Sequence, residues 1–242
     1  MREPTGSSPP VTDWAVTTWN LHGAHQPDIA RVAEALRTES PDVVLLQETR
    51  KPQAVALART LGMRFTWARK HSPYTRLAPH LAEGLTILTP HSLAAAGHTE
   101  VSDRASTSSW KRRIAQWARI GRPDGATLRA YNVHLSPHEQ HASLRRAEAV
   151  RLSTVVAEHG DLDEVIVGGD FNDDRDGSVI DLLPGIEHLT PPPTCPSRNP
   201  SKVLDHVLLP AHASGVSVAV PAGDGDWAAI SDHLPVTVRF TL

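Results

Sequence analysis

Apolar residues alternate or cluster along this chain in a way that predicts short strands mixed with a few helices. Residues 14–21 alternate and are rich in β-forming side chains, which is typical of a strand. Residues 42–46 form a short apolar run, which predicts a strand buried on both faces. Residues 28–39 and 53–61 repeat apolar side chains at helical spacing, and Gly62 follows the second segment as a helix stop signal.

The rest of the chain continues in the same manner without strict alternation of strands and helices. Further strands are predicted at 84–89, 115–121, 127–133, 165–168, 204–209, 216–220 and 236–242. Residues 139–159 give the longest predicted helix, and two polar loops at 97–113 and 190–200 are long enough to suggest a role at the surface. Without a repeat or a linker, we expect one domain over residues 11–242 after a disordered, Pro-, Ser- and Gly-rich tail at 1–10.

Composition describes an ordinary soluble protein and narrows its partners only a little. Hydrophobic residues make up 40% and charged residues 21%, and the formal net charge is −3, so the basic balance usual in nucleic-acid-binding proteins is lacking. This charge balance argues mildly against a nucleic-acid substrate but does not exclude one. Cys195 is the one cysteine, which fits a reducing compartment, and no apolar stretch suggests a signal peptide or membrane span. We therefore expect a cytoplasmic monomer with no stable membrane anchor.

Polar side chains stand at the margins of the predicted apolar strands. Asn20 follows the first strand, Glu48 the second, and Asp170 the strand at 165–168. A site built on one edge of a sheet produces this pattern. The other polar residues placed in this way are Asn132, His134, Asn172, Asp205, His206, Asp232 and His233.

Six short motifs then resemble those of the endonuclease/exonuclease/phosphatase superfamily, in the same order and over nearly the whole chain. They are TWNLHG (18–23), LLQET (45–49), NVHL (132–135), GGDFND (168–173), LDHVLL (204–209) and SDHLPV (231–236). The superfamily contains deoxyribonucleases, abasic-site endonucleases, neutral sphingomyelinases and inositol polyphosphate phosphatases. The resemblance implies an α/β fold, a four-layer αββα sandwich of two mainly antiparallel sheets flanked by helices.

The resemblance also implies a metal site, and the chemistry of phosphoesters agrees with it. Attack on an anionic phosphoester is slow until its charge is neutralised, and Mg²⁺ does this with one or two carboxylates and neutral oxygen ligands. Asn20 and Glu48 match the family's metal pair, and Asp232 is expected near the metal, or near Asp170 and the attacking water. Mn²⁺ is a possible substitute for Mg²⁺. Glu48 taken alone could equally be a solvated charge at a strand end.

Catalytic roles follow from the same resemblance. Asp170 is placed to orient and deprotonate a water after the Gly168-Gly169 turn, with Asn172 contacting the phosphate. His233 matches the family histidine near the phosphate, and Asp205 matches the carboxylate that holds its ring. His134 fits the branch with an Asn-x-His-Leu motif, and Glu83, before the strand at 84–89, is a candidate to orient it.

Two residues are candidates for substrate binding, and each also has a simple structural explanation. Arg113 stands where many relatives place a basic residue facing phosphate, although a solvated charge run explains it as well. Trp227 could stack on a base, sugar or lipid group, although packing explains it at least as readily. The other histidines, His22 among them, have no matched role.

Three functions are compatible with these residues. We favour a Mg²⁺-dependent phosphodiesterase of nuclease type, which cleaves by in-line attack of an activated water. A phosphomonoesterase of inositol-phosphate type ranks lower because only four lysines are present to hold extra phosphates, and a sphingomyelinase-like lipid hydrolase lacks an amphipathic basic helix. A non-catalytic scaffold would be expected to have lost a key carboxylate. The substrate, endo or exo action and the number of metal ions stay open.

Overall fold

A computed structural model describes residues 12–71, 79–103, 112–137, 141–158, 163–174, 179–183 and 186–242. The tail predicted at 1–10 lies outside the described residues, as does residue 11, so the domain is described from Thr12 onward.

Twelve strands in the described part of the chain form two six-stranded sheets. The first sheet has the order β11-β12-β1-β2-β4-β3. Its strands are β1 (Asp13–Asn20), β2 (Val43–Arg50), β3 (Arg64–His71), β4 (Glu83–Thr89), β11 (Ser214–Ala219) and β12 (Val236–Thr241). The second sheet has the order β5-β6-β7-β8-β10-β9. Its strands are β5 (Ser92–Glu100), β6 (Ile114–Gly121), β7 (Thr127–His134), β8 (Glu164–Asp170), β9 (Ile186–His188) and β10 (Asp205–Pro210).

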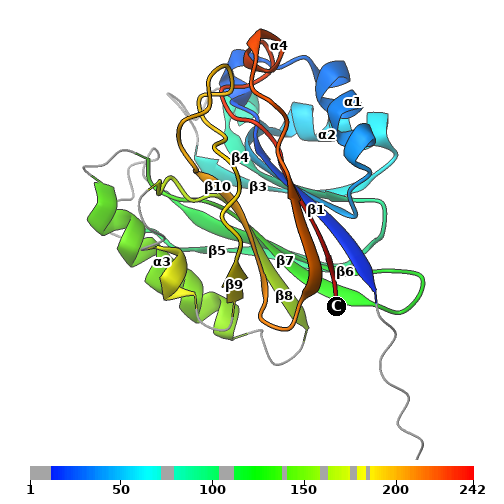
Figure 1. Ribbon diagram of the computed structural model, residues 1–242, viewed down its shortest axis with the longest axis vertical. Coiled ribbons are helices and arrows are strands. Elements are labelled where there is room, and N and C mark those ends of the chain that lie inside the picture. Colours follow the sequence, from blue (N-terminus) through cyan, green and yellow to red (C-terminus); the bar gives the residue numbers. More distant parts are fainter. Residues whose placement is uncertain are drawn as a thin grey trace, which may run out of the picture.

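Each sheet contains one parallel pair, and its other neighbouring strands are antiparallel. The parallel pairs are β1 with β2 and β7 with β8. The chain between the paired strands carries a helix: α1 (Ile29–Glu39) in the first sheet and α3 (Ala142–Ala157) in the second. Figure 1 shows α3 on one side of the two sheets, with α1 and α2 (Lys51–Leu61) on the other. The predicted four-layer αββα sandwich of mainly antiparallel sheets is therefore confirmed.

The apolar residues of β2 explain how the layers hold together. Val43 and Leu45 point into the core between the sheets, which they share with side chains of both sheets. Val44 and Leu46 point the other way, into the cluster formed with α1 and α2. All four side chains are fully buried, which confirms that this strand is covered on both faces.

Local signals set the helix ends. The Asp28 carboxylate accepts hydrogen bonds from the backbone N–H groups of Ala30 and Arg31, at 2.8 and 3.4 Å, and so caps α1. α2 stops at Gly62, whose φ of 68° lies in the left-handed region that glycine tolerates.

Four elements have weak sequence patterns and were not predicted. Charged residues in β3 and small residues in β5 obscure their strand character, while β9 and the helix α4 (Gly225–Ala228) are very short. The prediction of a loop at 97–113 is wrong for its first residues, because residues 97–100 belong to β5 and pair with β6. Its middle, residues 104–111, lies outside the described residues. Across the described ranges, no helix is long and apolar enough to cross a membrane.

Leu45 gives a test of the core between the sheets. Its side chain is fully buried, whereas Leu189 is 47% exposed. We expect Leu45→Ala to lower the free energy of unfolding by about 2–5 kcal/mol through lost burial and the cavity left behind. The matched Leu189→Ala should change it by less than about 0.5 kcal/mol. Urea unfolding curves of the two variants would show this, and equal midpoints would contradict the assigned core.

Candidate active site

Polar side chains from both sheets meet at one end of the sandwich, around a cavity of about 370 Å³. The strand ends that carry them are brought together by the two parallel pairs, since parallel strands end at the same edge of a sheet. Nine predicted site residues line this cavity: Asn20, Glu48, Glu83, Arg113, His134, Asp170, Asn172, Asp232 and His233. Three lining residues had no predicted role: His22, Lys70 and Pro137.

Glu48 reaches the cavity because β2 is irregular at this point. The register between β2 and β4 shifts between Leu46 and Thr49, and Glu48 has a φ of 52°, in the left-handed region. A left-handed conformation at a non-glycine residue is a strain often found at functional sites. Within the described ranges, its carboxylate makes one ion-pair contact, 3.8 Å from His134 Nδ1. Glu48 therefore presents oxygens to the cavity that few protein donors occupy.

Asp170 ends β8 and is almost fully buried. The preceding Gly169 has a φ of 149°, and a Cβ there would lie 2.0 Å from the Val133 carbonyl oxygen, so only glycine fits. Asp170 Oδ2 accepts a hydrogen bond from Asn20 Nδ2 at 3.0 Å, and Oδ1 accepts one from the Asn172 backbone N–H at 2.9 Å. Burial raises the pKa of Asp170 above its usual value.

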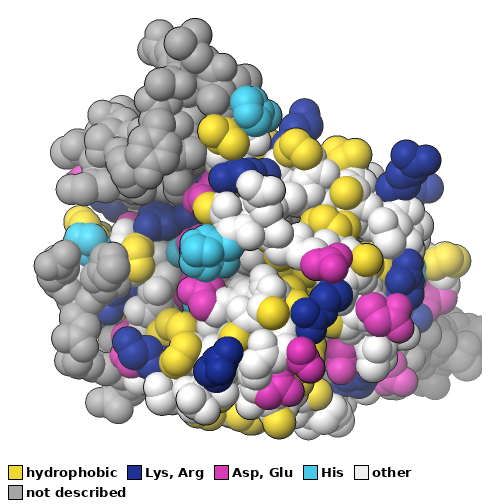
Figure 2. Space-filling view, turned by 90° about the horizontal axis from the view of Figure 1, so that it is seen from above, with side chains coloured by type: hydrophobic (Ala, Val, Ile, Leu, Met, Phe, Trp, Pro, Cys, Tyr) yellow, Lys and Arg dark blue, Asp and Glu magenta, His cyan; other side chains and the backbone are white. Residues whose placement is uncertain are grey.

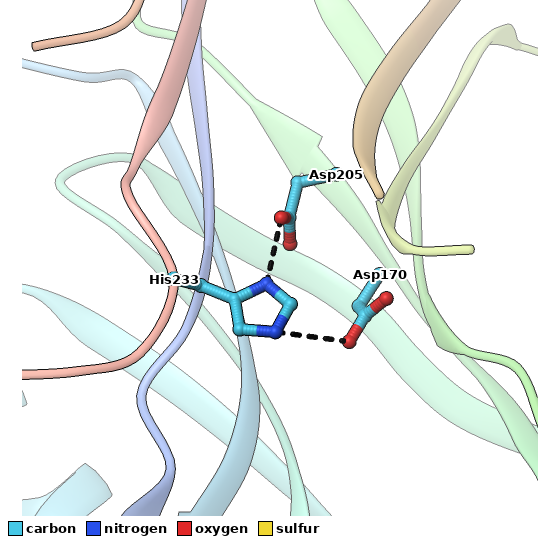
Figure 3. Close-up of side chains that lie close together, drawn as sticks. All are labelled: Asp170, Asp205 and His233. Carbon is cyan, nitrogen blue, oxygen red and sulfur yellow. Dashed lines mark hydrogen bonds and ion pairs between the residues drawn. The ribbon is translucent and has the colours of Figure 1, made fainter. Parts of the chain in front are cut away.

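His233 lies between two carboxylates, as Figure 3 shows. Its Nδ1 is 2.8 Å from Asp205 Oδ2, and its Nε2 is 3.9 Å from Asp170 Oδ2. Burial alone would lower the pKa of His233, but the negative charges of Asp205 and Asp170 hold it well above the usual value. Asp205 does not line the cavity and contacts the His233 ring through Nδ1.

Thr194 supports this arrangement and had no predicted role. Its hydroxyl donates to Asp205 Oδ2 at 2.6 Å, so the same oxygen is fixed from two sides. Thr194 lies in the Pro-rich stretch 190–200, which also contacts the loop that carries His233 through Ser197 N–H and the Asp232 carbonyl oxygen, at 2.8 Å. This stretch therefore helps to position the site.

His134 ends β7 and contacts groups of both charge signs. Its Nε2 is 3.7 Å from Asp170 Oδ2, while its Nδ1 is 3.2 Å from the ammonium nitrogen of Lys70. Lys70 is only 2% exposed, and burial, together with nearby Arg113, lowers its pKa to about 8. Lys70 was missed because β3, which carries it, was not predicted. Its burial results from tertiary packing, for which the sequence of the strand carries no signal.

Asp232 and His22 form a pair at the more open side of the cavity. His22 Nδ1 lies 3.3 Å from Asp232 Oδ1, and its ring packs on His25 with centroids 3.8 Å apart. The hydrogen bond to Asp232 raises the pKa of His22. Burial would raise the pKa of Asp232, but the contact with His22 holds it below its usual value. His22 has a φ of 46°, which makes TWNLHG a sharp turn into the site.

Arg113 faces the cavity as a buried cation. It is 6% exposed, and its Nε and Nη1 atoms have no hydrogen-bond partner among the described residues. Its neighbour Arg112 is instead paired with Glu100 at 3.3 Å. The solvated-charge reading therefore applies to Arg112 and not to Arg113.

Two aromatic side chains near the site pack into the protein instead of lining the cavity. Trp227 meets Trp19 edge to face, with ring centroids 5.7 Å apart, in the cluster beneath α1 and α2. Trp227 is half-buried and does not line the cavity, so this contact favours the packing alternative, while substrate stacking stays a prediction. His206 is buried edge-on against Phe171, at 5.6 Å.

The donor set fits a hard divalent cation. Glu48 and Asp232 offer carboxylate oxygens to the cavity. Among the described residues, Asn20 Oδ1 accepts a hydrogen bond only from the His22 backbone N–H, at 3.0 Å, which leaves one lone pair. Oxygen donors of this kind suit Mg²⁺ or Mn²⁺. Asp170, Asp205 and His233 also offer ligand atoms within 4.8 Å of one another, but the contact between Asp205 and His233 already occupies two of them.

Comparison with known proteins agrees with this geometry. The chain is 25% identical to the uncharacterized protein YbhP of Escherichia coli over 237 residues, covering 88% of each chain. An endonuclease/exonuclease/phosphatase from Bacteroides vulgatus superposes with a TM-score of 0.77 at 17% identity, over 95% of this chain and 98% of that one. A mannosyl-6-phosphatase from Bacteroides thetaiotaomicron superposes with a TM-score of 0.74 at 17% identity, over 95% of this chain and 100% of that one.

Members of the matching family are phosphoesterases, nucleases and phosphatases among them, and they typically depend on a divalent metal. The family's sequence model matches residues 17–233, from the middle of β1 to the site histidine. The chain therefore belongs to the endonuclease/exonuclease/phosphatase family.

Proposed function

We propose that this protein is a Mg²⁺-dependent hydrolase that cleaves a phosphodiester by in-line attack of an activated water. One observation carries the proposal: oxygen donors suited to a divalent cation, a buried carboxylate and three imidazoles line a single cavity. The family's phosphoesterase chemistry supports it. The scaffold alternative is disfavoured because Glu48, Asp170 and Asp232 all face that cavity.

Each group has a role that follows from its contacts. Asn20, Glu48 and Asp232 would hold the metal ion, which neutralises phosphate charge when bound. Asp170 would take the proton of the attacking water, since a carboxylate whose pKa is raised by burial binds a proton more readily near neutral pH. His233, held by Asp205, would direct Nε2–H at a phosphate oxygen, and the Asn172 side chain would contact the same group.

The surface favours a small or terminal phosphodiester over a long duplex. On the face shown in Figure 2, Lys and Arg side chains are scattered among acidic ones and do not join into a stripe. With a net charge of −3, few phosphates could be contacted along a nucleic-acid backbone. We therefore favour a nucleic-acid end or a small phosphodiester over a duplex interior as the substrate, and a cytoplasmic monomer stays part of the proposal.

A phosphomonoesterase is the second candidate. Lys70 and Arg113 are two buried cations on one cavity, and a terminal phosphate carries an additional negative charge that they could neutralise. A phosphatase acting on a mannosyl phosphate has the same fold, although at 17% identity.

Asp170→Asn tests the water-activating role. We expect kcat to fall by about 10²–10⁴-fold because the amide cannot accept the proton. Asp174→Asn, an exposed change in the following loop, should leave kcat unchanged. Rates with bis-p-nitrophenyl phosphate would be compared, and wild-type turnover by Asp170→Asn would refute the assignment.

Glu48→Gln tests the metal site. We expect about 10–100-fold weaker Mg²⁺ binding in calorimetry, since a charged ligand becomes neutral, and lower activity that partly returns at high Mg²⁺. Glu187→Gln, on an exposed side chain, is the control. Chelator should abolish wild-type activity, and added Mg²⁺ or Mn²⁺ should restore it. Equal Mg²⁺ affinity in both variants would mean that the ion binds elsewhere.

A substrate panel separates the two candidate functions. It would include bis-p-nitrophenyl phosphate, single- and double-stranded DNA, RNA, sphingomyelin and inositol phosphates, each with Mg²⁺ or chelator. We expect diesters to be turned over, with short or end-bearing substrates preferred. Turnover of the monoesters alone, with KM raised by Arg113→Gln, would reverse the ranking.

A further inference from the structure

Lys70 is a buried charge in an unusual environment. It lies on the edge strand β3, yet its side chain is 2% exposed and lines the cavity. An ammonium taken out of water is costly unless it is paired or hydrogen-bonded. Its hydrogen-bond contact is His134 Nδ1, at 3.2 Å.

This contact decides where the His134 ring carries its hydrogen. An ammonium has three donors and no acceptor, so a nitrogen in hydrogen-bond contact with it must accept. The lowered pKa of Lys70, about 8, is still above neutral, so the ammonium form predominates at pH 7. His134 Nδ1 is then without hydrogen, and the ring hydrogen is on Nε2.

The other side of the ring agrees with this tautomer. Nε2 lies 3.7 Å from Asp170 Oδ2, and the ring belongs to the cavity lining. Nε2 therefore lies beside the Asp170 carboxylate in the cavity, within reach of a group bound there. The carboxylate of Glu48 is farther from Nδ1, at 3.8 Å, than the ammonium of Lys70.

We propose that Lys70 is a positioning residue that fixes His134 Nδ1 as a hydrogen-bond acceptor and so keeps the ring hydrogen on Nε2, aimed at the substrate phosphate. This inference rests on the proposed function for its consequence in catalysis, but not for the tautomer itself. It assigns to Lys70 the orienting role that the sequence suggested for Glu83.

The nature of the partner changes what His134 can do. A carboxylate partner stabilises the imidazolium, which can release a proton to a leaving group. An ammonium 3.2 Å from Nδ1 instead fixes Nδ1 as the acceptor, which leaves Nε2–H as the group that donates a hydrogen bond. His134 then stabilises charge on the phosphate, while His233, paired with Asp205, is the ring suited to carry a positive charge.

The tautomer can be measured in the metal-free protein without any substrate. In nitrogen-15 spectra of histidine-labelled protein at pH 7, assigned through His134→Gln, we expect Nδ1 to show the signal of an unprotonated ring nitrogen and Nε2 that of a protonated one. Lys70→Met, close in length and without charge, should shift His134 toward a mixture of tautomers or the charged ring. Lys51→Met, at an exposed lysine, should change nothing.

Kinetics provide the second readout. We expect Lys70→Met to lower kcat by about 10²-fold, as for a misdirected catalytic group, with little change in KM. A rise in KM alone, with the tautomer unchanged, would overturn the proposal and make Lys70 a substrate contact. A hydrogen on Nδ1 in the wild-type protein would overturn it without any variant. If wild-type protein cleaves no phosphoester, the proposed function fails, and the nitrogen-15 spectra still decide the role of Lys70.

Discussion

Burial of the Asp170 carboxylate is the constraint around which the rest of the site is arranged. A carboxylate almost without solvent contact needs donors from the protein, and here they come from different segments of the chain. Asn20 belongs to the first sheet, whereas Asp170 itself and Asn172 belong to the second or its loops. The hydrogen bonds to this carboxylate therefore join the two sheets and hold it in place within the candidate site.

A buried hydrogen bond between Gln47 and Asn132, outside the cavity lining, also joins the two sheets. Gln47 Nε2 donates to Asn132 Oδ1 at 2.8 Å, and Asn132 Nδ2 donates to the carbonyl oxygens of Leu46 and Thr86. Gln47 Oε1 has no hydrogen-bond partner among the described residues, but the three bonds above link the two sheets and favour one relative placement of them. Residues next to it in sequence, Glu48 and Val133, are thereby held close to the site in a fixed register.

Much of this arrangement was predictable from sequence, for physical reasons that differ from residue to residue. The apolar run of β2 identifies a strand covered on both faces because no solvent-facing side would tolerate it. Asp170 was recognisable through the glycines before it, which a close backbone approach requires. Lys70 and Thr194 were not recognisable, because a lysine or threonine in a polar segment looks solvent-exposed until the packing of distant strands covers it. Their roles depend on tertiary contacts that leave no local periodicity.

Because β3 is an edge strand, its residues can change more readily in evolution than those of interior strands. The strand lies at the border of its sheet, with β4 as its one neighbour, whereas Asn20, Glu48 and Asp170 come from interior strands. A border strand exchanges residues or shifts its pairing with less disturbance than an interior one. The contact between Lys70 and His134 is therefore the part of the proposed site that changes most easily, and new selectivity can arise there while the proposed metal ligands stay in place.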